Sequence, residues 1–423
     1  MTSRDMLGRA GVVTVDEARG ILDMGLHPLP LDVERLPITA ALGRVLSSDV
    51  VTDRPLPEFP RSTMDGYAVK ARDTFGASDN LPALVAVVGE VLMGEEATQP
   101  VDKGQALRIS TGGMLPPGAD AVVMLEQTSP AGDDAIEVYR PVAPGENVVQ
   151  PGEDIKAGET LLTRGHRLRP QDLGALAGVG ATEIDVFRRV RVAIINTGNE
   201  IVEAGSAPRL GQVRDINSYN LMGLIQSDGG VAVRVGIIRD EYESIRAALG
   251  SALKDADVVA ITGGSSVGTR DLTARVISDM GGPGVLVHGV SVKPGKPVIL
   301  GVASGKPVFG LPGHPVAVSV SYELFIRPVL MRLSGEIDPI GLAGIPPVRV
   351  VSAKMTRNYS SSQGREDHLR VAIERIDGEL YARPILGKSG LITTLVRAHG
   401  TVVVPLSKIG LSKGETVEVR LFD

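Results

Sequence analysis

The sequence predicts an α/β plus β multidomain fold: a mostly parallel sheet covered by helices, a β-rich domain, and a small β-barrel or sandwich at the C-terminal end. Three observations support this. Apolar strand-like runs alternate with helical patterns from residue 187 to 335, as in parallel sheets. Short Val, Ile and Leu runs broken by Gly and Pro fill residues 33–186 without a long helical period. Similar short strands return within residues 336–423, after a linker at 334–347.

The first element along the chain is expected to be a helix. Thr14 and Glu17 have the spacing of a capping box, and apolar residues from Val15 to Leu26 recur on one face. The dipeptide His27-Pro28 ends this pattern. The sequence therefore predicts an amphipathic helix ahead of the β-rich region.

The α/β region begins with a buried strand at 190–195. The further elements expected there are strands at 231–238, 257–262, 285–287, 298–300 and 307–310, and helices at 218–227, 241–253, 271–280 and 315–333. Ligands of such sheets bind beyond the carboxyl ends of the strands. The loops after residues 195, 238 and 262 are therefore where chemistry is expected.

Composition excludes several classes of protein. The 423 residues include 44 Lys and Arg against 50 Asp and Glu, a net charge of −6, so no global positive field attracts nucleic acid or an anionic membrane. There is no Cys, and none of the six His lies at the spacing of a helical metal site, which argues against zinc and iron–sulfur enzymes. No apolar stretch of about 18 residues and no basic-then-apolar leader are present. We expect a soluble, cytoplasmic protein.

The richest loop runs from Thr262 to Asp271. Its glycines let backbone N–H groups approach an anion, and its hydroxyls add donors. It lacks the spacings of a Walker A loop and of a dinucleotide-binding loop. The candidate phosphate-binding residues are Gly263, Gly264, Ser265, Ser266 and Gly268. The alternative, of equal weight for Asp271, is a tight turn with this residue as N-cap.

Two other loops at the same predicted edge carry acids: Glu200 follows the first strand and Asp240 the second. Together with Asp271, they would supply the carboxylates that a magnesium ion beside a phosphate needs. Each acid alone would more simply be a helix cap or a solvated charge. The shared edge favours the joint site.

Two Pro- and Gly-rich segments follow. In Lys293-Pro-Gly-Lys296-Pro, the prolines fix φ, and two ammonium groups can lie on one side of the turn. Converging lysines suit a phosphate or an oxyanion, whereas an isolated segment of this kind would be an exposed, solvated turn. Gly310-Leu-Pro312-Gly-His314-Pro315 predicts a rigid loop with Pro at the first turn of the next helix.

Seven segments occur in an order that resembles the molybdopterin molybdenumtransferase family, which includes the E domain of gephyrin. They are Met64-Asp-Gly-Tyr-Ala68, Ile109-Ser-Thr-Gly112 with Pro116-Pro-Gly-Ala-Asp120, Gly152-Glu-Asp-Ile155, Asn196-Thr-Gly-Asn-Glu200, Gly263–Asp271, Lys293-Pro-Gly-Lys-Pro297 and Gly310-Leu-Pro-Gly-His-Pro315. The resemblance covers nearly the whole chain from about residue 14.

The resemblance implies an activity and an assembly. An adenylylated molybdopterin and molybdate become molybdenum cofactor with release of AMP, aided by Mg²⁺, in a four-part, elongated homodimer. The α/β domain resembles the molybdopterin adenylyltransferase fold, and that enzyme is a further expected partner. The four parts are 33–56 with 151–186, 57–150, 14–32 with 187–335, and the β-barrel 336–423.

The resemblance also assigns residues. Asp65 and Thr111 in the β-rich part, and Glu200, Asp240 and Asp271 in the α/β part, are the expected catalytic residues, the last three also holding the metal. The expected substrate-binding residues are those of the Gly-rich loop together with Lys293, Lys296, Pro312, Pro315, Arg365 and Ser389. Arg365 and Ser389 match segments associated with an oxyanion pocket for molybdate.

Two positions depart from the family pattern, and two other functions stay open. Most members have Asn at His314 and many have Arg at Val149. The first departure affects a hydrogen bond in the pterin cleft and the second a cationic contact. The alternatives are the adenylyltransferase reaction itself and a gephyrin-like, peptide-binding scaffold. The sequence does not distinguish molybdate from tungstate, nor identify the metal used in the cell.

Overall fold

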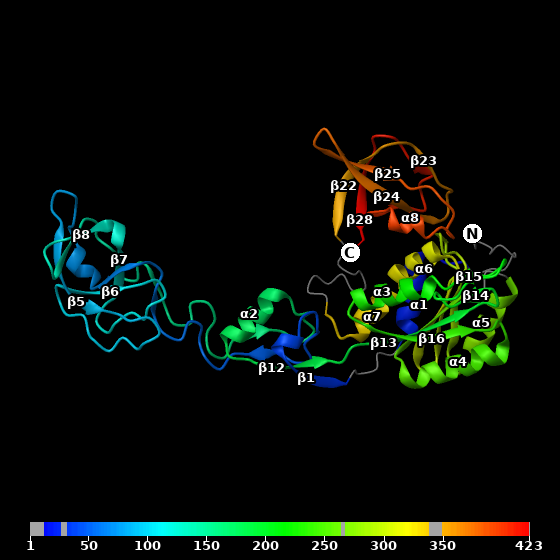
Figure 1. Cartoon of the computed structure of the whole chain (residues 1–423), viewed down its shortest axis with the longest axis horizontal. Coiled ribbons are helices and arrows are strands. Elements are labelled where there is room, and N and C mark those ends of the chain that lie inside the picture. Colours follow the sequence, from blue (N-terminus) through cyan, green and yellow to red (C-terminus); the bar gives the residue numbers. More distant parts are fainter. Residues whose placement is uncertain (1–11, 27–31, 264–266, 338–348, 423) are drawn as a thin grey trace. The chain divides into compact units, whose positions relative to one another are not determined.

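The structure is a computed structural model that describes residues 12–26, 32–263, 267–337 and 349–422, with the backbone alone at 267–270 (Figure 1). The chain divides into two compact units: residues 1–34, 43–47 and 186–423 form one, and residues 35–42 and 48–185 the other. The four-part division expected from the sequence stays a prediction.

The first unit contains the predicted α/β sheet. Its strands, in spatial order, are β16 (Val231–Ile238), β13 (Arg191–Thr197), β17 (Val258–Gly263), β21 (Lys306–Leu311), β20 (Ile299–Ala303) and β18 (Gly284–His288). The first four are parallel, whereas β20 is antiparallel to both β21 and β18. The expectation of a mostly parallel sheet is confirmed.

Apolar side chains of β13 alternate between two cores, one on each face of the sheet. Val192 and Ile194 join the core that also holds α1 (Val15–Gly25) and α3 (Asn217–Ser227). Ala193 and Ile195 join the core that holds α4 (Tyr242–Asp255) and α5 (Val267–Asp279). The helix α1 begins with the predicted capping box between Thr14 and Glu17.

The carboxyl ends of three strands lie in register. Thr197 of β13 pairs with Ile238 of β16 and with Gly263 of β17, so the loops after these strands leave the sheet at one edge, as predicted. The approach of β17 to β13 requires glycine: a Cβ on Gly263, whose φ is +133°, would lie 2.0 Å from the Thr197 carbonyl oxygen.

The helix expected at 315–333 is interrupted. It consists of α6 (Pro315–Ser321), a π-helical turn (Tyr322–Ile326) and α7 (Arg327–Leu333). Pro328 lacks a backbone N–H and its ring crowds the preceding turn. The regular α-helical hydrogen-bond pattern therefore cannot continue there. The short segments of this domain are β14 (Ile201–Val202), β15 (Val213–Arg214) and β19 (Val292–Lys293).

The C-terminal strands form the predicted barrel. They are β22 (Val350–Met355), β24 (Glu366–Ile376), β25 (Glu379–Pro384), β26 (Gly400–Val404) and β28 (Thr416–Leu421), with β23 (Tyr359–Ser360), β27 (Gly410–Leu411) and the short helix α8 (Thr393–Val396) between them. Pairing of β24 with both β25 and β26 closes the five strands on themselves. Most of the linker expected at 334–347 lies outside the described residues.

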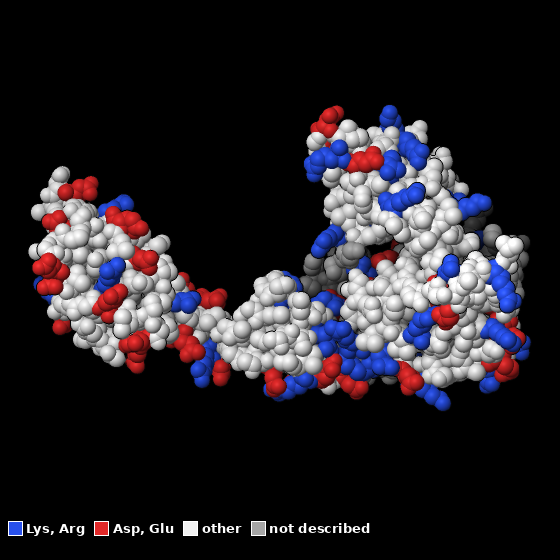
Figure 2. Space-filling model, in the orientation of Figure 1, with Lys and Arg blue, Asp and Glu red and all other residues white. Residues whose placement is uncertain are grey.

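The second unit is built on an antiparallel-rich sheet. Its order is β7 (Ala121–Met124), β4 (Gly66–Val69), β6 (Gln105–Ile109), β5 (Ala83–Glu90), β9 (Ala135–Val138) and β8 (Thr128–Pro130). Two buried clusters, one centred on Leu107 and Ile109 and one on Ala106 and Val123, cover its faces. Acidic side chains outnumber basic ones on the visible surface of this domain (Figure 2).

The remaining strands are short, and one helix was not expected. The strands are β1 (Val33–Pro37), β2 (Val50–Val51), β3 (Arg61–Ser62), β10 (Val148–Val149), β11 (Thr160–Leu162) and β12 (Glu183–Phe187). Residues 33–186 were expected to be β-rich without a long helical period, and α2 (Pro170–Gly178) is a short helix within them that was not predicted. Pro170 at its first turn and Asp172 near its N-terminus are start signals, but two glycines and a length of 9 residues weaken its helical period.

In the part of the chain that the structure describes, no helix is both long and apolar enough to span a membrane.

Candidate active site

The three candidate acids of the α/β domain follow neighbouring strands. Glu200 lies in the turn after β13, and Asp240 lies in the bend between β16 and α4. Asp271 lies in α5, which follows β17. Glu200 and Asp271 are exposed and Asp240 is half-buried. Two of the acids therefore lie in segments that leave one sheet edge, and the third lies in the helix that follows the neighbouring strand.

These acids do not form a ready-made metal cage. Across the described residues, no three Asp, Glu or His side chains come close enough together to hold a metal ion. Carboxylates are the ligands that Mg²⁺ prefers, and the ion usually takes one or two of them and completes its shell with water and substrate phosphate. The donor chemistry therefore fits Mg²⁺, whereas a site closed by protein groups alone is absent from these residues.

The helix α5 begins earlier than predicted, which changes the interpretation of Asp271. The sequence placed the helix start at residue 271, with this residue as a possible N-cap, whereas the helix begins at Val267. Asp271 is in the second turn and is not the N-cap. The backbone of Gly268 belongs to the first turn. The candidate residues Gly264, Ser265 and Ser266 lie outside the described residues.

A buried polar network that the sequence analysis missed underlies this edge. The Asp215 carboxylate is fully buried and accepts hydrogen bonds from Asn196 Nδ2 at 2.7 Å and from the Ser218 backbone N–H at 3.0 Å. Arg234 donates to its other oxygen at 3.2 Å. These three donors give both oxygens of the buried carboxylate hydrogen-bond partners. Asp215 thereby fixes the end of β13 against the start of α3.

Asn217 connects two loops of the same edge. Its amide nitrogen donates to Thr262 Oγ1 at 3.1 Å and to the Gly313 carbonyl at 2.9 Å. Thr262 precedes the Gly-rich loop, and Gly313 belongs to the loop before α6. The Oδ1 atoms of Asn196 and Asn217 are buried and accept no hydrogen bond from any described residue. The edge thus holds polar atoms with unused capacity.

One signal in the sequence indicates these residues. Asp215 lies just before α3 and Asn217 is the first residue of this helix, yet both are nearly fully buried. Polar side chains at the start of a predicted helix usually suggest capping. Asn196, at the end of an otherwise apolar strand, is the clearer sign of a buried polar function.

Lys293 is not the solvated lysine of an exposed turn. Its ammonium group donates to Asp367 Oδ2 at 2.7 Å and to Tyr359 Oη at 3.1 Å. Burial favours the neutral amine, but these two partners outweigh it and raise the pKa of Lys293. Both partners belong to the C-terminal barrel, and β19 pairs in parallel with β24, Lys293 opposite Asp367. The barrel therefore positions this cation.

The other residues of these two loops lie as follows. The segment from Pro294 to Pro297 is a turn, as predicted, and Lys296 within it is half-buried. Pro315 starts α6 at its first turn, as expected, and Pro312 is buried. Convergence of the two lysine ammonium groups stays a prediction.

His314 connects the loop before α6 to the barrel. Its Nδ1 lies 2.8 Å from Ser389 Oγ, and the backbone N–H of Val316 donates to the Ser389 carbonyl at 3.1 Å. The departure from Asn at this position thus keeps a polar contact, directed to a residue that the family resemblance places in the oxyanion pocket.

Arg365 lies on the same barrel, just before β24. One of its terminal nitrogens donates to Ser362 Oγ at 3.0 Å. Its Nε is buried and has no hydrogen-bond partner among the described residues. A guanidinium with an unused buried N–H is suited to an incoming oxyanion.

Asp65 and Thr111 belong to the other unit, where they contact each other. The Thr111 backbone N–H donates to Asp65 Oδ1 at 2.7 Å, and its hydroxyl donates to the same oxygen at 3.0 Å. These two bonds lower the pKa of Asp65. Two residues 46 positions apart, selected from separate motifs, are therefore one exposed carboxylate–hydroxyl pair.

Three families together match most of the chain. Residues 13–180 match the MoeA N-terminal region (domain I and II), residues 193–332 a probable molybdopterin binding domain, and residues 352–422 the MoeA C-terminal region (domain IV). A putative molybdopterin biosynthesis protein of Methanocaldococcus jannaschii is 36% identical over 397 residues, 92% of each chain. Molybdopterin molybdenumtransferase 2 of Mycobacterium tuberculosis is 33% identical over 390 residues, 91% of this chain and 94% of its own.

Solved structures match over nearly the same length. A molybdopterin biosynthesis MoeA protein of Pyrococcus horikoshii is 33% identical with a TM-score of 0.84, covering 97% of this chain and 100% of its own. A second structure of a MoeA protein from the same source is 38% identical with a TM-score of 0.79, covering 97% and 99%.

Proposed function

The chain belongs to the molybdopterin molybdenumtransferase family, a transferase family of molybdenum cofactor biosynthesis, and we propose that it inserts molybdate into adenylylated molybdopterin with release of AMP. The observation that carries this proposal is that two of the candidate residues, Lys293 and Ser389, lie at contacts between the α/β domain and the barrel. Acid-bearing loops leave one edge of the α/β sheet, and the barrel contributes Ser389 and the partner of Lys293 through direct contacts with the same domain.

Each side of this site has its own task. We assign the phosphates of the substrate to the Gly-rich loop and to the cations Lys293 and Lys296. Lys293 is already oriented by Asp367 and Tyr359, so little reorganisation is needed when phosphate charge develops. Pro312 and Pro315 would shape the adjoining wall. We assign molybdate, as a substrate, to Arg365 and Ser389.

Glu200, Asp240 and Asp271 would contribute carboxylates to Mg²⁺ brought in with the substrate phosphates. When bound, this ion would neutralise charge on the pyrophosphate as it is cleaved. The acids themselves would orient the attacking oxygen and accept its proton. Asp65, kept ionised by its two bonds from Thr111, supplies a further carboxylate.

We further propose that the protein works as a homodimer in the cytoplasm, receives its substrate from the molybdopterin adenylyltransferase, and completes each site with Asp65 of the partner subunit. Co-expression of differently tagged Asp65→Ala and Asp271→Ala chains tests this arrangement, because a mixed dimer would hold one intact site and one doubly damaged site. Random pairing should restore about a quarter of wild-type activity. Mixed dimers as inactive as both parents would contradict the shared site.

The reaction is tested by incubating the purified chain with adenylylated molybdopterin, Mg²⁺ and molybdate. AMP release and activation of a molybdenum-free apoenzyme should both require the chain. In a parallel incubation with molybdopterin and ATP, formation of adenylylated molybdopterin with release of pyrophosphate would indicate the adenylyltransferase reaction. Peptide capture without AMP release would indicate a scaffold.

The assignment of Arg365 to molybdate binding is tested with a variant in the same assay. Arg365→Ala should raise the molybdate concentration needed for half-maximal insertion and leave pterin binding nearly unchanged. Equal losses in both would place Arg365 elsewhere.

A further inference from the structure

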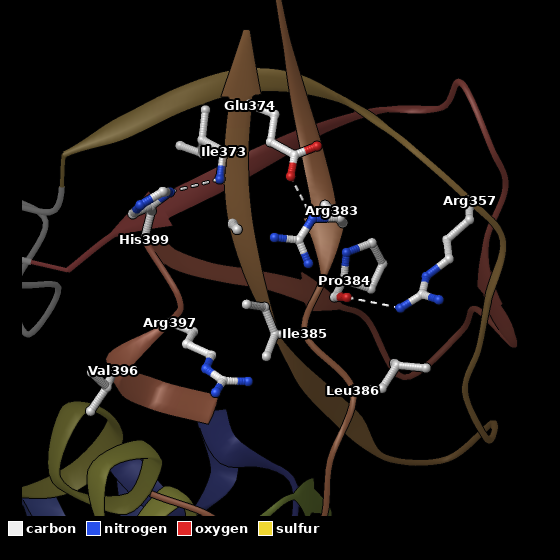
Figure 3. A pocket seen from close by; sticks show the side chains of 11 residues that line it. Arg357, Ile373, Glu374, Arg383, Pro384, Ile385, Leu386, Val396, Arg397 and His399 are labelled. Atoms are coloured by element: carbon white, nitrogen blue, oxygen red, sulfur yellow. Dashed lines mark hydrogen bonds and ion pairs between the residues drawn. The ribbon is translucent and has the colours of Figure 1, made fainter. Parts of the chain in front are cut away.

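The C-terminal barrel contains a pocket apart from all the candidate residues named above. Its volume is about 700 Å³, within the range of small-molecule sites. Strands β24 and β25 supply one side, the segment around the end of α8 supplies another, and Arg357 closes the third from the loop between β22 and β23 (Figure 3). None of the residues assigned to the molybdenum-transfer site lines it.

The charge of this pocket is opposite to that of the protein. Three arginines and one glutamate line it, so its formal charge is +2 in a chain of net charge −6. In Figure 3, Arg383 and Arg357 flank Pro384, and Arg397 reaches toward Ile385 from α8. A local cluster of guanidinium groups on an acidic protein attracts an anion at short range.

Much of the donor capacity of these arginines is unused. Arg383 contacts Glu374 through Nε alone, and Arg357 donates one bond, of 2.9 Å, to the Pro384 carbonyl. The Arg397 side chain makes no hydrogen bond or ion pair with any described residue. Each guanidinium has five N–H donors in a planar fork. Several of them therefore remain available to ligand oxygens.

His399 lines the pocket with a ring that is fixed by a backbone contact. Its Nδ1 accepts the backbone N–H of Ile373 at 2.9 Å, and its own backbone N–H donates to the Val371 carbonyl at 2.8 Å. A ring that accepts at Nδ1 keeps its proton on Nε2. The histidine is thus held by β24 in one tautomer.

The remaining lining is apolar. Ile385 is 8% exposed and forms the floor, whereas Leu386 and Val396 are 58% and 78% exposed. Leaving such side chains in water is unfavourable by roughly 25 cal/mol per Å² of apolar area. A ligand with an apolar body beside its charged group would cover them.

We propose that this pocket binds a phosphate monoester with a small apolar or aromatic body. A phosphate monoester carries about −1.5 to −2 charges at pH 7, which balances the +2 of the pocket, and its oxygens match the forked geometry of arginine. A carboxylate balances only half of this charge. The inference concerns binding alone and does not depend on the proposed transferase reaction.

The test uses the full chain, phenyl phosphate as the probe, and isothermal titration calorimetry at low salt. We expect binding with a Kd below about 1 mM, weaker binding of benzoate, and no binding of phenol. Affinity should fall as salt is added. Absence of phenyl phosphate binding, or equal binding of phenol, would overturn the proposal.

Variants locate the binding. Arg397→Gln, at an exposed side chain, and the double change Arg357→Gln with Arg397→Gln should raise the Kd at least about tenfold, since each removes a charge-assisted partner. The matched control is Arg375→Gln, an exposed arginine of β24 outside the pocket, which should bind as wild type. If Arg365→Gln or Lys296→Ala abolishes binding and the pocket variants do not, the probe occupies the transferase site and the proposal fails.

Discussion

Two regions that carry candidate catalytic acids are built in different ways. At the edge of the α/β sheet, the candidate acids are exposed or half-buried. A buried hydrogen-bond network that contains Asp215, Asn196 and Asn217 lies at the same edge. In the β-rich unit, Asp65 is exposed, and Thr111 alone supplies the two bonds to its carboxylate. The arrangement of the first region therefore depends on buried contacts, whereas the carboxylate of the second is held by a single neighbouring residue.

This difference indicates where substitutions should cost stability and where they should change only the chemistry. Buried polar groups lose free energy when a partner is removed, because the remaining group has no water to replace it. An exposed carboxylate that loses a hydrogen-bond partner binds water in its place. The α/β edge should therefore respond to changes several residues away from the acids, whereas the Asp65 pair should respond only locally.

The largest expected effect is that of Asp271→Asn on turnover. The substitution keeps size and polarity and removes the charge, so α5 should fold as before while AMP release falls at least about 100-fold. The free energy of unfolding should stay within about 0.5 kcal/mol. Asp255→Asn, at an exposed carboxylate of α4, is the matched control and should turn over normally. Wild-type turnover of Asp271→Asn would remove this residue from the reaction.

Asn217→Ala comes next and tests the support under the edge. Loss of the amide leaves Thr262 Oγ1 and the Gly313 carbonyl without this donor, which should cost about 1–3 kcal/mol of stability and slow AMP release as well. Thermal unfolding and turnover are measured together. Asn220→Ala, which removes a bond to Ser319 of α6 from the same helix, is the control: it should affect stability but not turnover. Unchanged values for Asn217→Ala would show that the edge needs no such support.

In the β-rich unit, a comparable sensitivity is expected at the buried carboxylate of Asp172. Burial raises its pKa, but bonds from Arg169 and His166 outweigh burial and bring the pKa to about 2, against an ordinary value of 3.8. A lowered folded-state pKa stabilises the protein above about pH 4, and this stability is lost as the pH falls toward 2. The amount is about 2 kcal/mol. Acid unfolding should therefore begin at higher pH in an Arg169→Gln variant; an unchanged midpoint would contradict this role.

Thr111→Val should give the smallest effect. It removes the hydroxyl donor and keeps the backbone N–H, the larger of the two causes of the lowered pKa. The pKa of Asp65 should therefore rise only part of the way to its ordinary value, with stability unchanged. Carboxyl ¹³C chemical shifts in an aspartate-labelled protein measure it directly. A pKa equal to that of wild type would mean that the backbone bond alone holds this carboxylate.

Much of the architecture could be predicted because it follows from periodicity. The strand at Val231–Ile238 and the capping box at Thr14 have the predicted bounds, since both depend on local pattern. The start of α5 could not be predicted, because the Gly-rich segment before residue 271 has a low helix propensity and favours a loop. The helix α2 was missed for the same reason: Pro170 and Asp172 indicate its start, but its glycines weaken the pattern.

In the candidate site, too, features that follow from local sequence were predicted and features that depend on tertiary contacts were not. Asp65 and Thr111 were selected from separate motifs and are in contact, and the loops bearing Glu200 and Asp240 leave one sheet edge as expected. Contacts between distant segments could not be derived from spacing. The pairing of Lys293 with Asp367 and the bond between His314 and Ser389 depend on how the barrel packs on the α/β domain. The burial of Asp215 depends on how α3 packs on β13 and β16.

The parallel pairing of β19 with β24 has a consequence for the order of folding. It joins Lys293 to Asp367, 74 residues further along the chain. Closing so long a loop costs entropy before any contact is gained, so such pairings form late. The lysine turn should therefore take its final form only after the barrel has closed. In native-state hydrogen exchange, the amides of β19 should exchange more readily than those of β13, because a two-residue strand pair opens at lower free energy than the centre of a sheet.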